Sequence, residues 1–363
     1  MHVWNGLAEV PADLPATVVS IGVFDGVHRG HQEILSSNVR AAKKRGALAV
    51  ALTFDPHPAQ VHRPEAGVAL IASLADRLDS MAQLGLDAVV VQPYTLDFAR
   101  QSGQEFIREV LVGTLHAAQV VVGQDVRFGR DNAGDGALLI SMGEELGFDV
   151  EIVSDLRGDI SGRRWSSTWV RELLAAGDVR RAAVVLGRPH RLRGVVQHGF
   201  KRGRELGYPT ANLDPDDLGV VPPDGVYAGW LIRPFHEGAD DAPGGDAGRA
   251  AGSGAGGLRS RPGGGLVDRD GHHRLPAAIS IGTNPQFDGP TRTVEAHVLG
   301  RTDLDLYGEE VVVELVEYLR PMLAFDDLDG LLVQMRADIE RAAAILEVPV
   351  PEPLDPQAVT AGT

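Results

Sequence analysis

Residues 17–31 of the chain read TVVSIGVFDGVHRGH, and this stretch decides the fold of the first half. It starts as a β-branched run and passes through glycines into residues 32–45, which have helical character. A strand that turns through glycines into a helix is where a parallel α/β sheet presents its loops to a ligand. The stretch therefore predicts a parallel sheet with a binding site at its edge.

The same alternation of strand and helix continues to about residue 153. Further short β-rich runs lie at Ala47–Thr53, Ala88–Gln92, Val120–Val122 and Val150–Val153. Helix-like segments separate them, as between Leu74 and Leu84, where apolar residues recur at helical spacing. This alternation is typical of a parallel sheet covered by helices.

After His190 the pattern changes to short strands separated by turn signals. We expect strands at Arg191–His198, Gly225–Ile232, Ala277–Ile281, Thr293–Leu299 and Glu310–Leu319. Such a series predicts an antiparallel barrel or sandwich. An apolar stripe from Leu328 to Leu346, preceded by the capping-type residues Asp326 and Asp327, predicts a terminal helix packed on it.

A length of 363 residues suits two domains. The helical stretch Val170–Leu186 is broken at Gly177–Asp178, and we place the domain boundary just after it, near Gly187. Residues 237–265 are so rich in glycine that they predict a disordered hairpin insertion. The predicted parts are residues 1–186, residues 187–348 with this insertion, and a frayed tail at 349–363.

The composition excludes several classes of protein. With 44% apolar and 23% charged residues the chain suits a globular protein, and the absence of cysteine excludes disulfides, thiolate nucleophiles and Cys-ligated metals. A net charge of −16 argues against a nucleic-acid partner. No apolar run approaches the roughly 20 residues that cross a bilayer, so we expect a cytoplasmic protein without a membrane partner. The oligomeric state stays open, a homo-oligomer included.

Two histidines, His28 and His31, end the stretch that decides the fold. Glycines let a phosphate approach the backbone, and the unpaired N–H groups and dipole of a helix N-terminus attract it. Two imidazoles three residues apart can reach that phosphate together. The alternative is that they only cap the helix.

These residues resemble the His-x-Gly-His motif of the nucleotidylyltransferase superfamily, and residues 166–171, SSTWVR, resemble its Ser-Ser-Thr-x-x-Arg signature. The resemblance implies that His28 and His31 bind the triphosphate of ATP and that Arg171 stabilises the developing negative charge. It further implies an ATP pocket that includes Gly22, Phe24, Asp25, Gly26, Gly30, Ser166, Ser167 and Thr168. Ser166 and Ser167 have helix capping as their alternative role. Because a substrate phosphate can attack the α-phosphorus, positioning and charge stabilisation carry such a reaction.

Residues 52–58, LTFDPHP, and 122–129, VGQDVRFG, resemble segments that line the flavin site of prokaryotic FAD synthetases. The resemblance implies flavin contacts from Phe54, Asp125 and Phe128. The two phenylalanines could stack on the isoalloxazine ring, and a plain core role is their alternative.

In the second half, residues 201–212, KRGRELGYPTAN, resemble the signature of riboflavin kinases, as do 281–285, 292–297 and 305–308. The resemblance implies that Gly203, Thr210 and Asn212 bind ATP and that Glu295 is the general base for the riboflavin 5′-hydroxyl. The oxygens of Thr210 and Asn212 suit Mg²⁺. An exposed strand carboxylate is the alternative for Glu295.

A P-loop kinase is excluded because the lysines, Lys43, Lys44 and Lys201, end no such motif.

Together the motifs resemble the bifunctional riboflavin kinase/FMN adenylyltransferase family from Thr17 to Leu346. That resemblance implies a Rossmann-like nucleotidylyltransferase domain followed by a six-stranded antiparallel barrel with a C-terminal helix. It implies Mg²⁺- and ATP-dependent phosphorylation of riboflavin to FMN, then transfer of AMP from ATP to FMN, giving FAD and pyrophosphate. Two alternatives stay open: a transferase for another phosphorylated acceptor, such as phosphopantetheine or glycerol phosphate, and a flavin-binding regulator without catalysis. The insertion, Trp169 at an often basic position, and Asp125, where some relatives carry Asn, depart from the family pattern.

Overall fold

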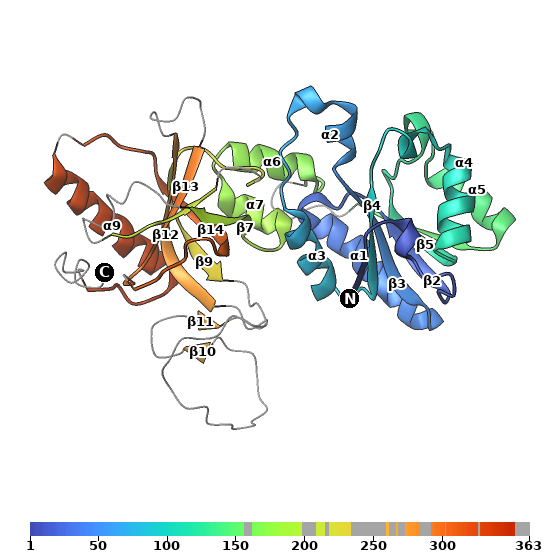
Figure 1. Ribbon diagram of the computed structural model, residues 1–363, viewed down its shortest axis with the longest axis horizontal. Coiled ribbons are helices and arrows are strands. Elements are labelled where there is room, and N and C mark those ends of the chain that lie inside the picture. Colours follow the sequence, from blue (N-terminus) through green and yellow to red (C-terminus); the bar gives the residue numbers. More distant parts are fainter. Residues whose placement is uncertain are drawn as a thin grey trace, which may run out of the picture. The chain divides into compact units, whose positions relative to one another are not determined.

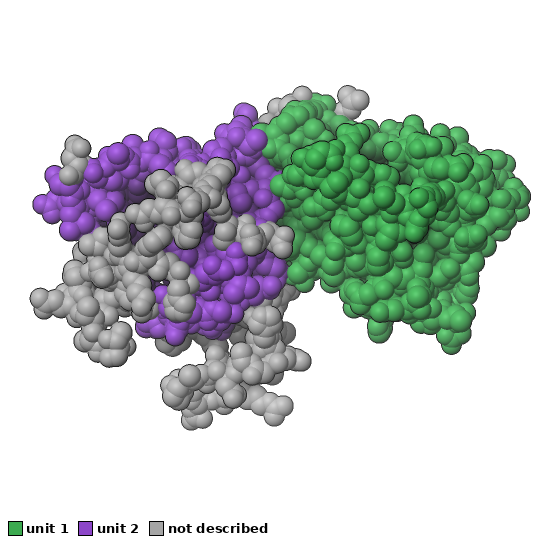
Figure 2. All heavy atoms as spheres, turned by 45° about the horizontal axis from the view of Figure 1, so that its top comes forward, with its two compact units in different colours: residues 1–172, 184–188 green, residues 173–183, 189–363 purple. Residues whose placement is uncertain are grey.

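The computed structural model describes residues 1–155, 162–197, 208–214, 218–233, 259–260, 266–267, 273–283, 292–301, 303–325 and 327–352. They form two compact units, shown in different colours in Figure 2. Unit 1 comprises residues 1–172 and 184–188, and unit 2 comprises residues 173–183 and the described chain from residue 189 onward.

Unit 1 is built on a six-stranded parallel sheet in the order β1-β4-β3-β2-β5-β6. Figure 1 labels its strands β2, β3, β4 and β5. The strands are β1 (His2–Trp4), β2 (Thr17–Ile21), β3 (Leu48–Asp55), β4 (Ala88–Pro93), β5 (Ala117–Gly123) and β6 (Asp149–Val153). The chain runs from β2 through β3 to β4 on one side and then places β5 on the other side of β2. Loops at the carboxyl ends of β2 and β5 therefore diverge, and such a switch point forms a crevice for ligands.

Alternate residues of the strands enter two separate cores. Val19 and Val120 pack with the helical segment 103–114 and with α5, while Val18 and Val121 pack with α1 and α3. This alternation follows from the period of two along a strand. The helices of the unit are α1 (Arg29–Arg45), α2 (Pro58–His62), α3 (Leu74–Gln83), α4 (Gly103–Glu105) with its π-helical continuation Phe106–Thr114, α5 (Gly136–Leu146) and most of α6 (Ser167–Ala175).

Local sequence fixes where these helices begin and end. His28 caps α1, which ends at Gly46 in the left-handed conformation at φ 64°. Ser73 caps α3 and Asp135 caps α5, each accepting a backbone N–H three residues on. The predicted break at Gly177–Asp178 is confirmed, since α6 ends before it and α7 (Val179–Leu186) begins after it.

Unit 2 contains a closed six-stranded antiparallel barrel in the order β9-β12-β13-β8-β7-β14, with β14 pairing back to β9. Its strands are β7 (His190–Gln197), β8 (Ala211–Leu213), β9 (Gly225–Arg233), β12 (His273–Thr283), β13 (Arg292–Val298) and β14 (Glu310–Arg320). At Gly229 a Cβ would lie 1.9 Å from the Glu314 carbonyl oxygen, so only glycine allows this approach of β9 and β14.

The terminal helix α9 (Leu328–Leu346) covers one outer face of the barrel. Asp327 caps it by accepting the Gly330 N–H, as its sequence predicts. Buried Asp338 on the helix accepts three hydrogen bonds of 2.6–3.0 Å from Arg320 of β14. Ile339, Ala342 and Leu346 complete the contact by burying their apolar side chains against the strands.

The predicted fold class is confirmed. Strands β1 and β8 were not predicted, because each is only three residues long and gives too little alternation to detect. Within the segment predicted as a disordered insertion, Arg259–Ser260 form β10 and pair with β11 (Leu266–Val267), which pairs with β12. Backbone pairing needs no apolar side chains, so composition alone does not reveal it.

Candidate functional sites

Two adjoining cavities open at the carboxyl ends of the parallel strands of unit 1. The larger, about 400 Å³, and the smaller, about 240 Å³, share five lining residues. The shared residues are His31, Ile34, Gly123, Asp125 and Ser167. The two cavities therefore share one wall.

The smaller cavity brings together two motifs that are far apart in the sequence. His28, Gly30 and His31 come from the start of α1, and residues 164–168 come from the segment that opens α6. Ser154 and Asp155, after β6, add to its wall. The predicted ATP residues His28, Gly30, His31, Ser166, Ser167 and Thr168 all line it. Backbone N–H groups of a helix N-terminus and hydroxyls are suitable donors for a triphosphate.

The imidazoles of His28 and His31 stack with their centroids 3.6 Å apart. His28 also caps α1, because its Nδ1 accepts the His31 backbone N–H at 3.4 Å. The capping role and the phosphate-binding role are therefore compatible in one residue. Phe24 holds the pair from the other side through an edge contact with His31 at 5.4 Å.

Burial lowers the pKa of His28 to about 4, with the nearby Arg164 guanidinium as the next cause. Burial also lowers the pKa of His31 well below its ordinary value, followed by the effects of His28 and Arg164. Both rings are neutral near pH 7, so each offers an N–H donor without placing two cations in contact.

Acid should destabilise the fold through His28. Above pH 6.5 the ring is neutral in both the folded and the unfolded chain. Below that pH the unfolded chain binds a proton at His28, whereas the folded chain does so only near pH 4. The free energy of unfolding should then fall by up to about 1.4 kcal/mol per pH unit from this residue. Denaturant unfolding of the parent and of His28→Asn, each at pH 7 and pH 5, measures this loss of stability. The Asn variant keeps a capping acceptor but has no imidazole. An equal loss in both proteins would contradict it.

The larger cavity carries an aromatic wall. Phe54 contacts Tyr94 at 5.6 Å and Phe98 at 5.9 Å between centroids, and Phe106 contacts Phe128 at 5.4 Å. Phe54 and Phe128 are nearly buried and belong to the sheet core, yet both line the cavity. An apolar slot of this kind suits a planar ring system.

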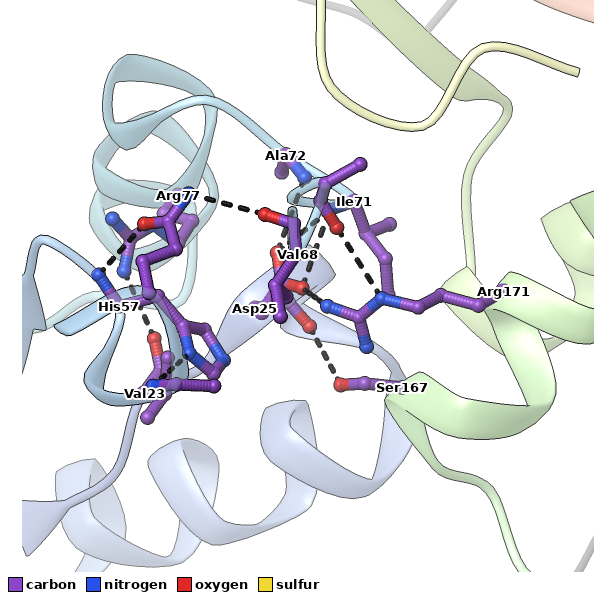
Figure 3. Close-up of polar contacts among 12 residues, drawn as sticks. Val23, Asp25, His57, Val68, Ile71, Ala72, Arg77, Ser167 and Arg171 are labelled. Atoms are coloured by element: carbon purple, nitrogen blue, oxygen red, sulfur yellow. Dashed lines mark hydrogen bonds and ion pairs between the residues drawn. The ribbon is translucent and has the colours of Figure 1, made fainter. Parts of the chain in front are cut away.

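Asp25 lies at the centre of a hydrogen-bonded cluster, shown in Figure 3. Its buried carboxylate accepts the N–H groups of Ile71 and Ala72 at 2.9–3.2 Å and pairs with Arg171. Arg171 also donates to the Ala69 carbonyl, and the Ser167 hydroxyl donates to the Asp25 carbonyl at 3.0 Å. The cluster ties the loop after β2 to residues 69–72 and to α6.

Arg171 was predicted to lie at the reacting phosphates, and the structure places it in this cluster. Neither cavity lining includes Arg171, whose guanidinium is engaged by Asp25 and Ala69. Gly22, Phe24 and Asp25 line the larger cavity rather than the smaller one. Gly26 lines neither; at φ 77° it turns the loop, and a Cβ there would meet Ile71 at 2.8 Å.

Replacing Asp25 with asparagine should weaken adenylylation by loosening this cluster. The change keeps the shape but leaves the Arg171 charge without its carboxylate, at a cost of about 1–3 kcal/mol in the free energy of unfolding. FAD formation from FMN should fall by about tenfold or more, with riboflavin phosphorylation unchanged. Asp149→Asn removes an exposed carboxylate that pairs with Arg45 and serves as the matched control. Equal FAD rates in the two variants would refute the idea.

Sequence reasoning overlooked Arg164, which lines the smaller cavity. Its guanidinium pairs with Asp125 at 2.5 Å and with Asp155 at 3.2 Å. The basic pair Arg163–Arg164 just before the Ser-Ser-Thr segment was the available signal. Tyr94 and Phe98 were also missed, and their place just after β4, at the ligand edge of the sheet, could have revealed them.

A second candidate site lies on the barrel, where β13 faces β8. Glu295 is paired in register with Asn212, and the Thr210 hydroxyl donates a hydrogen bond to the Glu295 carboxylate. The Asn212 amide Nδ2 contacts the Thr210 backbone and hydroxyl oxygens at 3.3 Å. Three predicted kinase residues from two separate motifs are thus brought together. The predicted residue Gly203 lies outside the described residues.

Burial raises the pKa of Glu295, and the hydrogen bond from Thr210 opposes that rise. A carboxylate that is hard to ionise is a stronger base once it is ionised.

Comparisons with known proteins match each half of the chain to a protein family. A family model described as FAD synthetase matches residues 10–169, and one described as riboflavin kinase matches residues 186–346. The bifunctional riboflavin kinase/FMN adenylyltransferase of Escherichia coli strain K12 is 32% identical over 334 residues, which are 92% of this chain and 93% of the relative. The chain belongs to the bifunctional riboflavin kinase/FMN adenylyltransferase family. Its member from Pseudomonas fluorescens is 32% identical over 346 residues, covering 95% of this chain and 98% of the relative.

Among solved structures, the crystal structure of a macrolide-efflux protein from Streptococcus pneumoniae has a TM-score of 0.74 at 27% identity. It covers 94% of this chain and 97% of that chain. Among the described residues, no helix is long and apolar enough to cross a membrane.

The predicted family and the two predicted activities are confirmed. The chain is a riboflavin kinase and an FMN adenylyltransferase that uses ATP as co-substrate. The alternatives of another phosphorylated acceptor and of a non-catalytic flavin regulator are set aside.

Proposed function

We propose that the two cavities of unit 1 carry the adenylyl transfer and that the Thr210–Asn212–Glu295 cluster carries the phosphorylation. The observation that supports the first assignment is the shared wall of the two cavities. ATP lies in the smaller cavity with its triphosphate on His28 and His31. FMN lies in the larger cavity with its ring on the aromatic wall, near Phe54 and Phe128, and its phosphate at the junction by Asp125.

In this arrangement the FMN phosphate oxygen attacks the α-phosphorus of ATP and pyrophosphate leaves. The neutral imidazoles and the N-terminus of α1 donate hydrogen bonds to the oxygens that gain charge. Arg171 supports the reaction by holding the loop of Asp25 in place. This positioning role replaces the predicted direct role, because its guanidinium is already engaged.

On the barrel, Glu295 accepts the proton of the riboflavin 5′-hydroxyl as that oxygen attacks the γ-phosphorus of ATP. The residues present fit a magnesium ion, because the Thr210 hydroxyl and the Asn212 amide supply hard oxygen donors beside a carboxylate. When bound, Mg²⁺ neutralises charge on the nucleotide phosphates. Thr210 and Asn212 would hold it, while Glu295 stays available for the proton.

We place the boundary between the two catalytic domains near Gly187, giving residues 1–186 and 187–348. The matched regions, 10–169 and 186–346, support this division. The cytoplasmic location stays a prediction, and the oligomeric state stays open.

Chromatography of flavins tests the proposal. The purified protein is incubated with riboflavin, ATP and Mg²⁺, and a parallel sample starts from FMN. FMN followed by FAD is expected from riboflavin, and FAD directly from FMN. FAD formed only from supplied FMN would mean that the barrel has no kinase activity. The absence of any flavin product would contradict both assignments.

A further inference from the structure

The strand that carries Glu295 also carries a buried histidine to which no role has been assigned. His297 follows two residues later on β13, so both side chains point to the same outer face of the barrel. The residues between and beside them, Val294, Ala296 and Val298, are buried on the other face. His297 is 5% exposed.

The imidazole of His297 holds the residue next to Thr210. Its Nδ1 lies 2.9 Å from the Pro209 carbonyl oxygen. A carbonyl oxygen only accepts hydrogen bonds, so Nδ1 carries the proton and donates it. Nε2 is then the unprotonated nitrogen, and it has no hydrogen-bond partner in the part of the chain that the structure describes.

Two side chains of one strand thus hold two consecutive residues of the facing segment. Glu295 accepts the Thr210 hydroxyl, and His297 donates to the carbonyl of Pro209. The paired register of β8 with β13 begins at Ala211, so Pro209 and Thr210 precede the paired residues. Because proline has no backbone N–H, its carbonyl is the one backbone group it offers as an anchor.

A contact with Tyr208 also fixes the position of His297. The ring of Tyr208 meets its imidazole edge-on at a centroid distance of 5.4 Å. Tyr208 in turn packs against the apolar cluster between the barrel and α9. Burial lowers the pKa of His297, which keeps the ring neutral and its tautomer set by Pro209.

We propose that His297 is a positioning residue for the kinase reaction: its Nδ1–H fixes Pro209, so that Thr210 and Asn212 present their oxygens beside Glu295. The inference rests on the proposed function of that cluster. His297 itself touches no reacting atom.

Three substitutions of His297 test whether kinase activity depends on the Nδ1–H donor rather than on the volume of the side chain. In His297→Asn the amide nitrogen takes the place of Nδ1, in His297→Gln it lies where Nε2 was, and His297→Leu has no donor. The kinase kcat/KM for MgATP should fall by about tenfold in the Leu and Gln variants and stay within about twofold of the parent in the Asn variant. An acid limb should remain in the pH profile of all three variants, because Glu295 is intact.

FAD formation from supplied FMN, measured on the same preparations, reports whether unit 1 is folded and should be unchanged. Thermal unfolding of the Asn and Gln variants controls for loss of the barrel, since both are polar and of similar size. Equal kinase rates in these two variants would overturn the proposal, as would a lost acid limb in either. A Glu295→Gln variant with full kinase activity would instead overturn the proposed function of the cluster.

Discussion

Replacing Glu295 with glutamine is expected to lower FMN formation from riboflavin by about 10²–10⁴-fold, the usual contribution of a general base. The amide keeps the size of the side chain and can still face Thr210, but it cannot take the proton of the 5′-hydroxyl. FAD formation from supplied FMN should continue, because that reaction uses unit 1. Flavin chromatography after incubation with riboflavin, or with FMN, measures both outcomes in one preparation.

Glu310→Gln on β14 is the matched control, since that carboxylate is partly exposed and pairs with Arg193. Because burial raises the pKa of Glu295, the kinase rate of the parent should decline with falling pH at a midpoint above 4.5, the ordinary carboxyl pKa. The ionised form is the base, so activity is present above this midpoint and lost below it. A Gln variant that retains the parent rate, or the parent acid limb, would show that another group takes the proton.

Changing both His28 and His31 to alanine should let FMN accumulate without FAD. The double change removes two N–H donors at the proposed triphosphate, and loss of a single such donor costs about 10²–10³ in rate. The kinase half-reaction should be unchanged. Accumulated FMN and absent FAD on the same chromatogram separate this result from general unfolding.

His28→Asn refines the experiment, because asparagine can still accept the His31 N–H and cap α1. If the histidines matter only as caps, this variant keeps normal FAD synthesis; if the imidazole acts on phosphate, FAD synthesis falls as in the alanine variant. His2→Ala removes an exposed imidazole from β1 and should change nothing. FAD synthesis at the parent rate in the double alanine variant would disprove the assignment.

Much of the candidate site could be predicted from short stretches of sequence. The strand–glycine–histidine run placed His28 and His31 at the start of α1, and the structure brings Ser166–Thr168 onto the same cavity, as the resemblance implied. In the barrel, Thr210, Asn212 and Glu295 also meet as implied. Motifs of this kind are readable because local chemistry, such as a glycine turn or a capping residue, is fixed within a few residues.

Other parts depended on contacts that no local pattern reveals. Arg171 belongs to a predicted motif, yet its partner Asp25 is 146 residues away and decides which way the guanidinium points. The anchoring of Pro209 by His297 spans 88 residues. Arg164 carries no pattern of its own beyond its charge.

By itself, the sequence determined the class of each half, since strand and helix periodicity and the glycine turns act over short range. The resemblance of its motifs determined the family and the two activities. Only the tertiary structure decided which residues share a cavity, that Asp25 engages Arg171, and that the ring nitrogens of His28, His31 and His297 are neutral. These properties arise from burial and from long-range pairing, which exist only once distant segments have packed together.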